Sequence, residues 1–363
     1  MKVLVLSGRF GMGHEMAANA ICEQFRKLDK DTEIVKKDLL EELYPHISKL
    51  IFGGFRLMVE HCHGIYNFIY KMSGKMKVEM QPRGAAIYKK LKKILEKEQP
   101  DVIVCTHPMC VKAIASYKEK TGIKTPLVTC ITDISMHPEW TAPQTDIYLA
   151  PTQEIKRHLM KKGARAEDIL VTGIPVRQQF LDADCCQKRE RNRTRRVLIM
   201  GGGLGLMPDL KELLEKLHSM QGVESVVITG KNHKMYEEWV NRYEDVEVLG
   251  YTENISRYMR GADLVITKAG GITLFEILHS QVPLFVIHPF LEQEMNNARY
   301  AAEKGFAKVI WGRREDYIQE LEKLLSDEKM MEEMTGNVRR ACKEMIEVSL
   351  DEAVGIMEER MTA

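Results

Sequence analysis

The sequence has no apolar run long enough to cross a membrane, no low-complexity segment and almost no net charge. A membrane-spanning helix needs about 20 consecutive apolar residues, so we expect a protein that is soluble or attached to a membrane surface. The N-terminal segment MKVLVLSG is too short for a signal peptide and runs into a glycine turn. With a formal net charge of +1, no overall field attracts nucleic acid, which is therefore not an expected partner.

Cysteine occurs eight times, but in no pattern that is typical of a zinc site. No CxxC pair is present, and several cysteines lie inside apolar runs, as Cys105 and Cys130 do. We therefore expect reduced, mostly buried thiols in a cytosolic protein. The tripeptide His61-Cys62-His63 has no acidic or further Cys or His partner nearby, so we predict no metal site there.

Short apolar runs alternate with helical segments in two series of five. Continuous apolar strands separated by helices are typical of parallel sheets that are covered on both faces. At 363 residues the chain is long for one core. We therefore predict an α/β protein with two Rossmann-like domains. The runs are Val3–Leu6, Val102–Cys105, Leu127–Ile131, Ile147–Ala150 and Ile169–Thr172, and then Val197–Met200, Val226–Thr229, Val246–Leu249, Leu264–Thr267 and Leu284–Ile287.

A basic segment separates the two series. Residues 187–196 hold six basic residues, one acidic residue and no apolar one, which favours a solvated linker. We therefore predict a first domain over residues 1–186 and a second over residues 197–342. No strand follows the second domain's final helices, and we expect the last helix, about residues 343–363, to pack back on the first domain.

One segment does not fit a plain α/β layout. Residues 44–80 combine aromatic and large aliphatic residues with glycines, and residues 71–97 contain nine Lys or Arg against two Glu. Apolar and basic residues together are typical of a segment that touches anionic lipid headgroups. The alternative is that the apolar residues pack in the core while the lysines form a solvated helix face. The sequence leaves both interpretations open.

The first apolar run leads into SGRFGMGHEMAANAI, which predicts a glycine turn and then a helix. Glycines let the backbone turn tightly and approach a ligand, and a helix N-terminus favours negative charge. The dinucleotide pattern G-x-G-x-x-G is not met, because Gly11-Met12-Gly13 is followed by His14. A lone histidine is structural more often than catalytic, so this stretch alone leaves the role of His14 open.

Stretches that suit a nucleotide follow the strands predicted in the second half, at the edge where open α/β sheets bind ligands. The loop Gly201–Gly205 and the turn from Gly270 to Thr273 present backbone N–H groups of the kind that hold a diphosphate. Lys231 and Asn232 offer a cation and an amide at the same edge. The stretch Tyr251–Ile255 offers an aromatic ring and backbone amides for a base.

Two further features suit a sugar. Glu276 lies just inside the helix that follows Gly270, where a carboxylate can accept two hydrogen bonds from a ribose diol. Its alternative role is that of an acidic residue complementing the helix dipole. Residues 289–298 crowd acidic and amide side chains after another strand, and a hydroxyl-rich ligand needs that mixture of acceptors and donors.

The order of these motifs resembles the GT-B glycosyltransferases of family 28. They include the monogalactosyldiacylglycerol synthases, the bacterial processive diacylglycerol glucosyltransferases and the peptidoglycan enzyme that makes lipid II. The matching patterns are GxGHxxAAxAI at residues 11–21, TD…HPxW at 132–140, VTGIPVR at 171–177, KAGGxTxxE at 268–276 and QExxNA at 293–298. The GxGH and QExxNA forms are closer to the diacylglycerol enzymes.

This sequence departs from the family pattern at two places. Arg9 stands where plant galactolipid synthases typically carry Asp. Leu291 and Glu292 replace the proline and glycine that are usual in PxPGQE, which leaves the sugar contacts open.

The resemblance implies two Rossmann-like domains whose parallel sheets face an interdomain cleft. It implies an inverting glycosyltransferase that moves a hexose from a UDP-sugar to a lipid acceptor, with diacylglycerol as the expected acceptor. No cofactor or metal is expected, because helix N-termini can stabilise the departing UDP. The expected partners are the UDP-sugar, the lipid and an anionic membrane surface, with a peripheral location on the inner face of the cell membrane. The alternatives are an enzyme like the UDP-N-acetylglucosamine 2-epimerases, a UDP-sugar sensor, or a transferase that uses a polyprenyl or other hydrophobic acceptor.

The resemblance also implies roles for single residues. His14, at the cleft, would be the general base, or else a hydrogen-bond donor to the UDP-sugar, and Asp133 is the alternative base. His107 is a further candidate, and the residues expected at the acceptor are Gly13, His137 and Trp140. The residues expected to bind the donor are Gly202, Gly203, Lys231, Asn232, Tyr251, Ile255, Gly270, Gly271, Thr273, Glu276, Gln293, Glu294 and Asn297.

Overall fold

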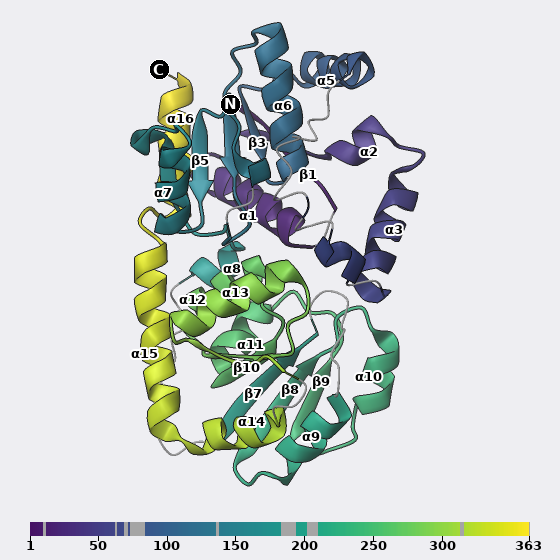
Figure 1. The fold of residues 1–363 in the computed structure, drawn as a ribbon, viewed down its shortest axis with the longest axis vertical. Coiled ribbons are helices and arrows are strands. Elements are labelled where there is room, and N and C mark those ends of the chain that lie inside the picture. The colour runs from purple at the N-terminus through teal and green to yellow at the C-terminus, as the bar shows by residue number, and fades with distance from the viewer. Residues whose placement is uncertain are drawn as a thin grey trace. The chain divides into compact units, whose positions relative to one another are not determined.

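The computed structural model describes residues 1–9, 12–61, 64–68, 72, 84–135, 138–182, 194–201, 210–312 and 316–362. The chain divides into two compact units. The first comprises Met1–Gln178 and Glu344–Ala363, and the second comprises Gln179–Lys343. Each unit contains one six-stranded parallel sheet with helices against it (Figure 1). The predicted α/β class with two Rossmann-like sheets is therefore confirmed.

The first unit alternates strands with helices in chain order. Its strands are β1 (Lys2–Ser7), β2 (Glu33–Asp38), β3 (Val102–Cys105), β4 (Leu127–Cys130), β5 (Ile147–Ala150) and β6 (Ile169–Val171). Its helices are α1 (Met12–Leu28), α2 (Leu39–Leu43), α3 (Ser48–His61), α5 (Ala85–Glu98), α6 (Pro108–Thr121), α7 (Gln153–Lys161) and α16 (Leu350–Thr362), with the 3-10 turns η1 (Pro138–Trp140) and η2 (Ala166–Asp168). The short helix α8 (Gln178–Leu181) lies at the boundary of the two units.

The second unit repeats this alternation. Its strands are β7 (Arg195–Met200), β8 (Val223–Ile228), β9 (Val246–Leu249), β10 (Leu264–Thr267), β11 (Leu284–Ile287) and β12 (Ala307–Ile310). Its helices are α9 (Leu210–Ser219), α10 (His233–Trp239), α11 (Ile255–Gly261), α12 (Gly271–Ser280), α13 (Glu292–Glu303), α14 (Tyr317–Ser326) and α15 (Glu328–Met345).

The strand order of each sheet marks one point where a ligand is expected. The first sheet has the order β2-β1-β3-β4-β5-β6, so the chain order reverses between β1 and β3. The second has the order β12-β11-β10-β7-β8-β9, so it reverses between β7 and β10. At such a point the two following loops leave the sheet on opposite sides and open a crevice at the carboxyl ends of the strands. The residues after β1, β3, β7 and β10 are therefore expected to lie nearest to a bound ligand.

Each sheet has one edge strand that the apolar runs do not predict. Strand β2, with the sequence EIVKKD, has four charged residues, and every one of its residues is at least partly exposed. Strand β12 is the other outer strand and carries Lys308. An edge strand is not enclosed on both sides, so its sequence need not be continuously apolar.

The predicted linker and terminal helix differ from the structure in detail. Arg195 and Arg196 begin strand β7, so the end of segment 187–196 is not linker, and residues 183–193 lie outside the described residues. In place of one terminal helix, α15 ends at Met345 and α16 begins at Leu350.

Helix α16 packs on the sheet of the first unit beside α1. Ala353, Val354 and Met357 are fully buried in the same apolar cluster as Ile21 and Phe25. Burying a Val or Met side chain contributes about 1.5–3 kcal/mol, so this contact fixes the C-terminal segment to the first unit.

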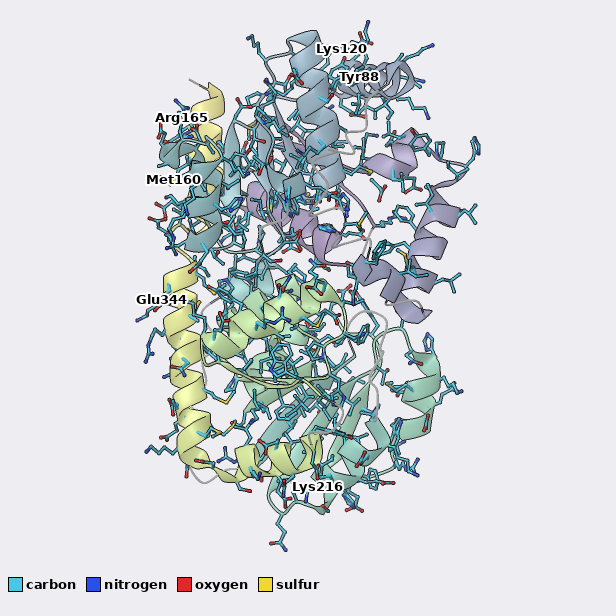
Figure 2. All side chains as sticks on the ribbon, in the orientation of Figure 1. Tyr88, Lys120, Met160, Arg165, Lys216 and Glu344 are labelled. Atoms are coloured by element: carbon cyan, nitrogen blue, oxygen red, sulfur yellow. The ribbon has the colours of Figure 1, made fainter. Side chains whose placement is uncertain are left out.

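The lysine-rich helix α5 packs against α6 through its other face. Leu91 and Ile94 are buried, and the Tyr88 hydroxyl lies 2.6 Å from Ser116 Oγ. Lys120 Nζ lies 4.9 Å from the centre of the Tyr88 ring (Figure 2). Leu91 and Ile94 of α5 are therefore core residues, whereas its lysines at positions 89, 90, 92 and 93 are exposed.

Candidate functional site

His14 lies where the strand order of the first sheet reverses. It is in the first turn of α1, just after β1, and its ring is partly buried. Its Nδ1 is 2.9 Å from the Thr106 carbonyl oxygen and 2.7 Å from Thr132 Oγ1. A carbonyl can only accept, so we assign the hydrogen to Nδ1, and Nε2 of the neutral ring then carries the lone pair. Within the described residues Nε2 makes no hydrogen bond, so it is the atom that can take a proton.

The surroundings of His14 keep its ring uncharged at neutral pH. Burial lowers its pKa below the ordinary histidine value and outweighs the Asp133 charge and the Thr106 hydrogen bond, which both raise it. A neutral imidazole with a defined tautomer is what a general base requires.

His107 is the aromatic neighbour of His14. The two ring centres are 4.5 Å apart, with the rings at 72°. His107 caps helix α6, because its Nδ1 accepts a hydrogen bond from the Met109 N–H at 3.1 Å. Burial, followed by the neighbouring His14, holds the pKa of His107 well below its usual value. His107 therefore caps α6 and packs its ring against that of His14.

Asp133 follows strand β4, close enough for its charge to act on His14. Its carboxylate is buried and accepts a hydrogen bond from Trp140 Nε1 at 2.7 Å. The Trp140 ring centre is 6.2 Å from that of His14. Gly13 is partly exposed, and a Cβ added there meets no described atom within 4 Å. His137 lies outside the described residues.

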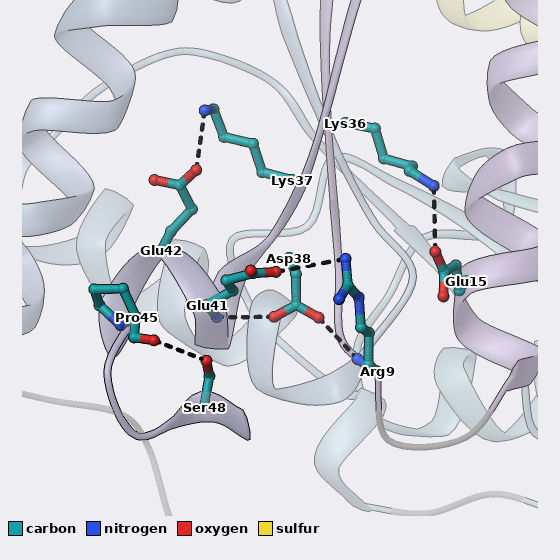
Figure 3. A network of polar contacts seen from close by, with 9 residues as sticks. All are labelled: Arg9, Glu15, Lys36, Lys37, Asp38, Glu41, Glu42, Pro45 and Ser48. Atoms are coloured by element: carbon teal, nitrogen blue, oxygen red, sulfur yellow. Dashed lines mark hydrogen bonds and ion pairs between the residues drawn. The ribbon is translucent and has the colours of Figure 1, made fainter. Parts of the chain in front are cut away.

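The loop that leads to His14 is attached to helix α2 by Asp38. The backbone N–H of Arg9 donates to Asp38 Oδ2 at 2.9 Å, and the N–H of Glu41 donates to Oδ1 of the same carboxylate at 2.9 Å (Figure 3). The Arg9 guanidinium pairs with Glu41 at 3.5 Å on the exposed surface, where such a pair contributes at most about 1 kcal/mol. In this chain Arg9 is therefore a surface residue paired with α2.

In the second unit, strand β10 leads into a helix N-terminus that is suited to an anion. Helix α12 begins with Gly271, Ile272 and Thr273. The backbone N–H groups of these three residues have no hydrogen-bond partner among the described residues. Gly270 caps the helix without a side-chain hydrogen bond, and a Cβ added there would lie 3.3 Å from Thr273 Oγ1. Aligned N–H groups and the helix dipole attract phosphate. Gly202 and Gly203, predicted at the neighbouring loop, lie outside the described residues.

Asn297 holds the backbone just before this turn by a hydrogen bond. It is almost fully buried in α13, and its Nδ2 donates to the Ala269 carbonyl at 2.9 Å. Its Oδ1 is buried and has no hydrogen-bond partner in the described part of the chain. Asn297 thus fixes the backbone that precedes the N–H groups of α12.

Two candidate carboxylates lie on the helices that follow β10 and β11. Glu276 is buried in the second turn of α12, and no acidic residue is in the first turn, so it is not placed where an acid best complements the helix dipole. Glu294 is in the first turn of α13, where burial raises the pKa of its carboxyl group although the Lys268 charge and a hydrogen bond from the Leu291 backbone lower it. Gln293 precedes it in the same turn.

Lys268 is a further candidate site residue, which is not among those predicted from the sequence. Its Nζ lies 4.9 Å from the centre of the Phe290 ring, and both residues line a small cavity with Glu294. Lys268 is the first residue of KAGG, directly after β10, and that position is the signal that could have predicted a cation beside the start of α12.

The remaining predicted donor residues follow β8 and β9. Lys231 is exposed, while Asn232 caps α10 by accepting a hydrogen bond from the Met235 N–H at 3.1 Å. Tyr251 is 63% exposed, and Ile255 begins α11. These four residues lie at the same edge of the sheet as the α12 turn, and their contact with a donor stays a prediction.

Among the residues that the structure describes, no group of three or more His, Cys, Asp or Glu side chains is placed to hold a metal ion. No helix in the described ranges is both long and apolar enough to pass through a bilayer.

Comparison with known proteins defines the class of enzyme. Residues 14–176 match the family described as monogalactosyldiacylglycerol (MGDG) synthase, and residues 196–349 match the glycosyltransferase family 28 C-terminal domain. The chain is 30% identical over 354 residues to a processive diacylglycerol beta-glucosyltransferase of Bacillus licheniformis, covering 93% of this chain and 90% of that protein. The chain therefore belongs to glycosyltransferase family 28, and it is a UDP-sugar-dependent glycosyltransferase. Within that family its relatives are the diacylglycerol enzymes, as the motifs predicted.

Solved structures confirm the GT-B architecture. MurG of Acinetobacter baumannii superposes with a TM-score of 0.63 at 13% identity, covering 99% of each chain. UDP-GlcNAc 2-epimerase of Neisseria meningitidis superposes with a TM-score of 0.58 at 16% identity over the whole of both chains. The fold is thus shared by transferases and by the epimerase alternative, and it is the sequence relatives that favour the transferase.

Proposed function

We propose that this enzyme transfers a hexose from a UDP-sugar to the free hydroxyl of diacylglycerol, with inversion at the anomeric carbon. The observation that carries the proposal is the position of His14 at the β1/β3 reversal point, with Nδ1 at hydrogen-bond distance from the Thr106 carbonyl and Thr132 Oγ1. The tautomer assigned from these contacts leaves Nε2 able to take a proton. The relatives are diacylglycerol glucosyltransferases by name, which supports the choice of acceptor.

In the proposed reaction, His14 Nε2 removes the proton of the acceptor hydroxyl as that oxygen attacks the anomeric carbon. The bond from this carbon to the UDP oxygen breaks on the opposite face, so the electron pair leaves with UDP and the configuration inverts. The proton remains on His14. The Thr106 carbonyl and the nearby Asp133 charge favour the resulting imidazolium, because both raise the pKa of His14.

The donor is proposed to bind in the second unit. The N–H groups of residues 271–273 face the diphosphate, together with Gly202 and Gly203 of the preceding loop and Lys231 and Asn232 at the edge. Glu276 accepts from the ribose hydroxyls, Gln293 and Glu294 contact the sugar, and the stretch Tyr251–Ile255 holds uracil. Helix N-termini stabilise the charge that develops on UDP, so the reaction is proposed to need no divalent metal.

The test is product analysis with each donor in turn. The purified protein is incubated with UDP-glucose, UDP-galactose or UDP-N-acetylglucosamine and detergent-dispersed diacylglycerol, and the lipid extract is analysed by mass spectrometry. We expect a lipid that gains hexose with one or two of the donors. Conversion of UDP-N-acetylglucosamine to an epimer without any lipid product would contradict the proposal and favour the epimerase alternative.

The pH dependence of the reaction tests the protonation state of His14. Because burial holds the pKa of His14 below about 6.5, kcat/KM is expected to stay level from pH 8 to pH 7 and to fall only below that value. The measurement is kcat/KM for the lipid in detergent between pH 5 and pH 8.5. A rate that already halves between pH 8 and pH 7 would contradict a neutral, buried base.

We further propose that the first unit attaches peripherally to the inner face of the cell membrane through helix α3 and the segment after it. Large apolar side chains are exposed there, with Leu50 78% and Phe68 64% accessible, and Leu57 and Ile65 are exposed as well. The exposed lysines of α5 belong to the same unit and suit anionic headgroups. Exposed apolar side chains in such a group are otherwise costly in a soluble protein.

Neutralising the α5 lysines is expected to weaken membrane binding more than catalysis. Lys90 donates to the Leu43 carbonyl and is left in place, while Lys89, Lys92 and Lys93 are changed to Gln. Each lysine near an anionic surface contributes about 1 kcal/mol, so binding to vesicles is expected to fall by one to two orders of magnitude. The measurement is co-sedimentation with phosphatidylglycerol vesicles, beside activity on detergent-dispersed lipid.

The matched control changes three exposed lysines of the second unit, Lys211, Lys234 and Lys329, to Gln. It removes the same charge, so equal losses in both variants would mean that only net charge matters. Unchanged sedimentation of the α5 variant would count against the membrane proposal.

A further inference from the structure

Trp140 is completely enclosed, although its ring lies beside the candidate base. The side chain has 0% exposure, and its Nε1–H donates to Asp133 Oδ2 at 2.7 Å. The ring centre is 6.2 Å from that of His14, with the planes tilted by 47°. The indole N–H therefore forms its hydrogen bond inside the protein, with Asp133, a residue that is itself only 6% exposed.

The backbone that carries Trp140 is held by its own unit. Lys112 of α6 is buried, and its Nζ donates to the Thr141 carbonyl at 2.7 Å. The Tyr148 hydroxyl of β5 donates to the Ala142 carbonyl at 2.8 Å and accepts from the Ala142 N–H at 3.2 Å. Two neighbouring elements thus fix the segment after η1, and the indole is placed without help from a ligand.

We propose that Trp140 is a positioning residue for sugar transfer, whose indole N–H fixes the Asp133 carboxylate in the orientation from which its charge stabilises protonated His14. The inference rests on the proposed role of His14 as the base. A buried carboxylate needs a hydrogen-bond donor, and Trp140 supplies one at a defined direction. Because the charge on His14 develops only as the proton transfers, the benefit of this orientation is gained in the transition state.

The kinetic test uses Trp140→Phe, which keeps an aromatic ring and removes the N–H donor. We expect kcat to fall about 10- to 100-fold, with KM for donor and lipid within about threefold. A rise in KM for the lipid with kcat unchanged would overturn the inference and favour the acceptor-binding role predicted from the sequence. The control Trp239→Phe alters a buried tryptophan in the core of the second unit and is expected to leave kcat unchanged.

A double-mutant cycle tests whether Trp140 acts through Asp133. If it does, Trp140→Phe combined with Asp133→Asn is no slower than Asp133→Asn alone, because the group that the indole positions has already lost its charge. Multiplying effects would mean that Trp140 acts independently, and would overturn the inference. Should Trp140→Phe fail to fold, a benzothienylalanine at position 140 keeps the shape of the indole and replaces the N–H by sulfur.

A readout that needs no activity separates this inference from the proposed function. In ¹⁵N-histidine spectra, with His14 assigned from His14→Ala, Asp133→Asn is expected to shift the His14 titration midpoint to lower pH, because the Asp133 charge raises its pKa. In the Trp140→Phe background that shift should be less than half as large. An equal shift in both backgrounds overturns the inference even if lipid glycosylation is established. A diminished shift in a protein that glycosylates no lipid supports the positioning and refutes only the proposed function.

Discussion

Replacing His14 with alanine is expected to lower kcat for lipid glycosylation by about 10²- to 10⁴-fold, the usual contribution of a general base. The reason is geometric. Nδ1 is bound to the Thr106 carbonyl and Thr132 Oγ1, which leaves Nε2 as the only proton acceptor of the ring. The measurement is kcat and KM on detergent-dispersed diacylglycerol, beside UDP binding by calorimetry. UDP affinity is expected to change by less than about threefold.

The comparison with Asp133→Asn decides between the two candidate bases. We expect a smaller loss of kcat in Asp133→Asn than in His14→Ala, together with a pH profile whose acid limb moves to lower pH, because the charge that raises the pKa of His14 is gone. If Asp133→Asn were the slower variant, the base would be Asp133. If His14→Ala instead lost UDP affinity, His14 would be a donor ligand.

The sheets could be predicted from the sequence because their inner strands are continuous apolar runs. Strands β2 and β12 could not, since four of the six residues of β2 are charged and Lys308 interrupts the four-residue strand β12. The outer strands β6 and β9 were found, because each still lies in a mostly apolar run. The final helix begins later than predicted, at Leu350 and not at about residue 343, because α15 continues to Met345 and residues 346–349 separate the two helices.

The motif was enough to select His14 as a candidate site residue, but the tautomer of its ring could not be predicted. The tautomer depends on a carbonyl 92 residues away, which the order β2-β1-β3 brings beside the ring. Likewise the sequence predicts Trp140 only as an acceptor-binding residue, and the hydrogen bond from its Nε1–H to Asp133 is found only in the structure. In the second unit, Asn297 and Ala269 are far apart in sequence and adjacent in space, and that contact is a property of the fold.

Replacing Glu276 with glutamine is expected to weaken UDP binding roughly 100-fold. A carboxylate can accept hydrogen bonds from both ribose hydroxyls, and each charge-assisted bond contributes about 1.5–3 kcal/mol. The amide of glutamine has one acceptor oxygen, and its NH₂ group would face the second hydroxyl with a donor. Glutamine keeps the volume of a side chain that is buried in α12, so the helix is expected to persist. The measurement is calorimetric titration with UDP and with 2′-deoxy-UDP, beside thermal unfolding of each variant.

The deoxy ligand makes the test specific to the ribose. The unchanged protein should prefer UDP to 2′-deoxy-UDP by at least tenfold, and Glu276→Gln should bind the two almost equally, because the missing hydroxyl then has no charged partner to lose. The matched variant Glu294→Gln, placed at the sugar, should keep full affinity and preference for UDP while raising KM for the UDP-sugar. If Glu276→Gln kept the preference of the unchanged protein, the ribose would be recognised elsewhere, and Glu276 would be a buried acid of α12 serving its own unit. If both variants lost UDP affinity to the same extent, the two carboxylates would act together through their charge on the turn from Gly270 to Thr273, and not separately on ribose and sugar.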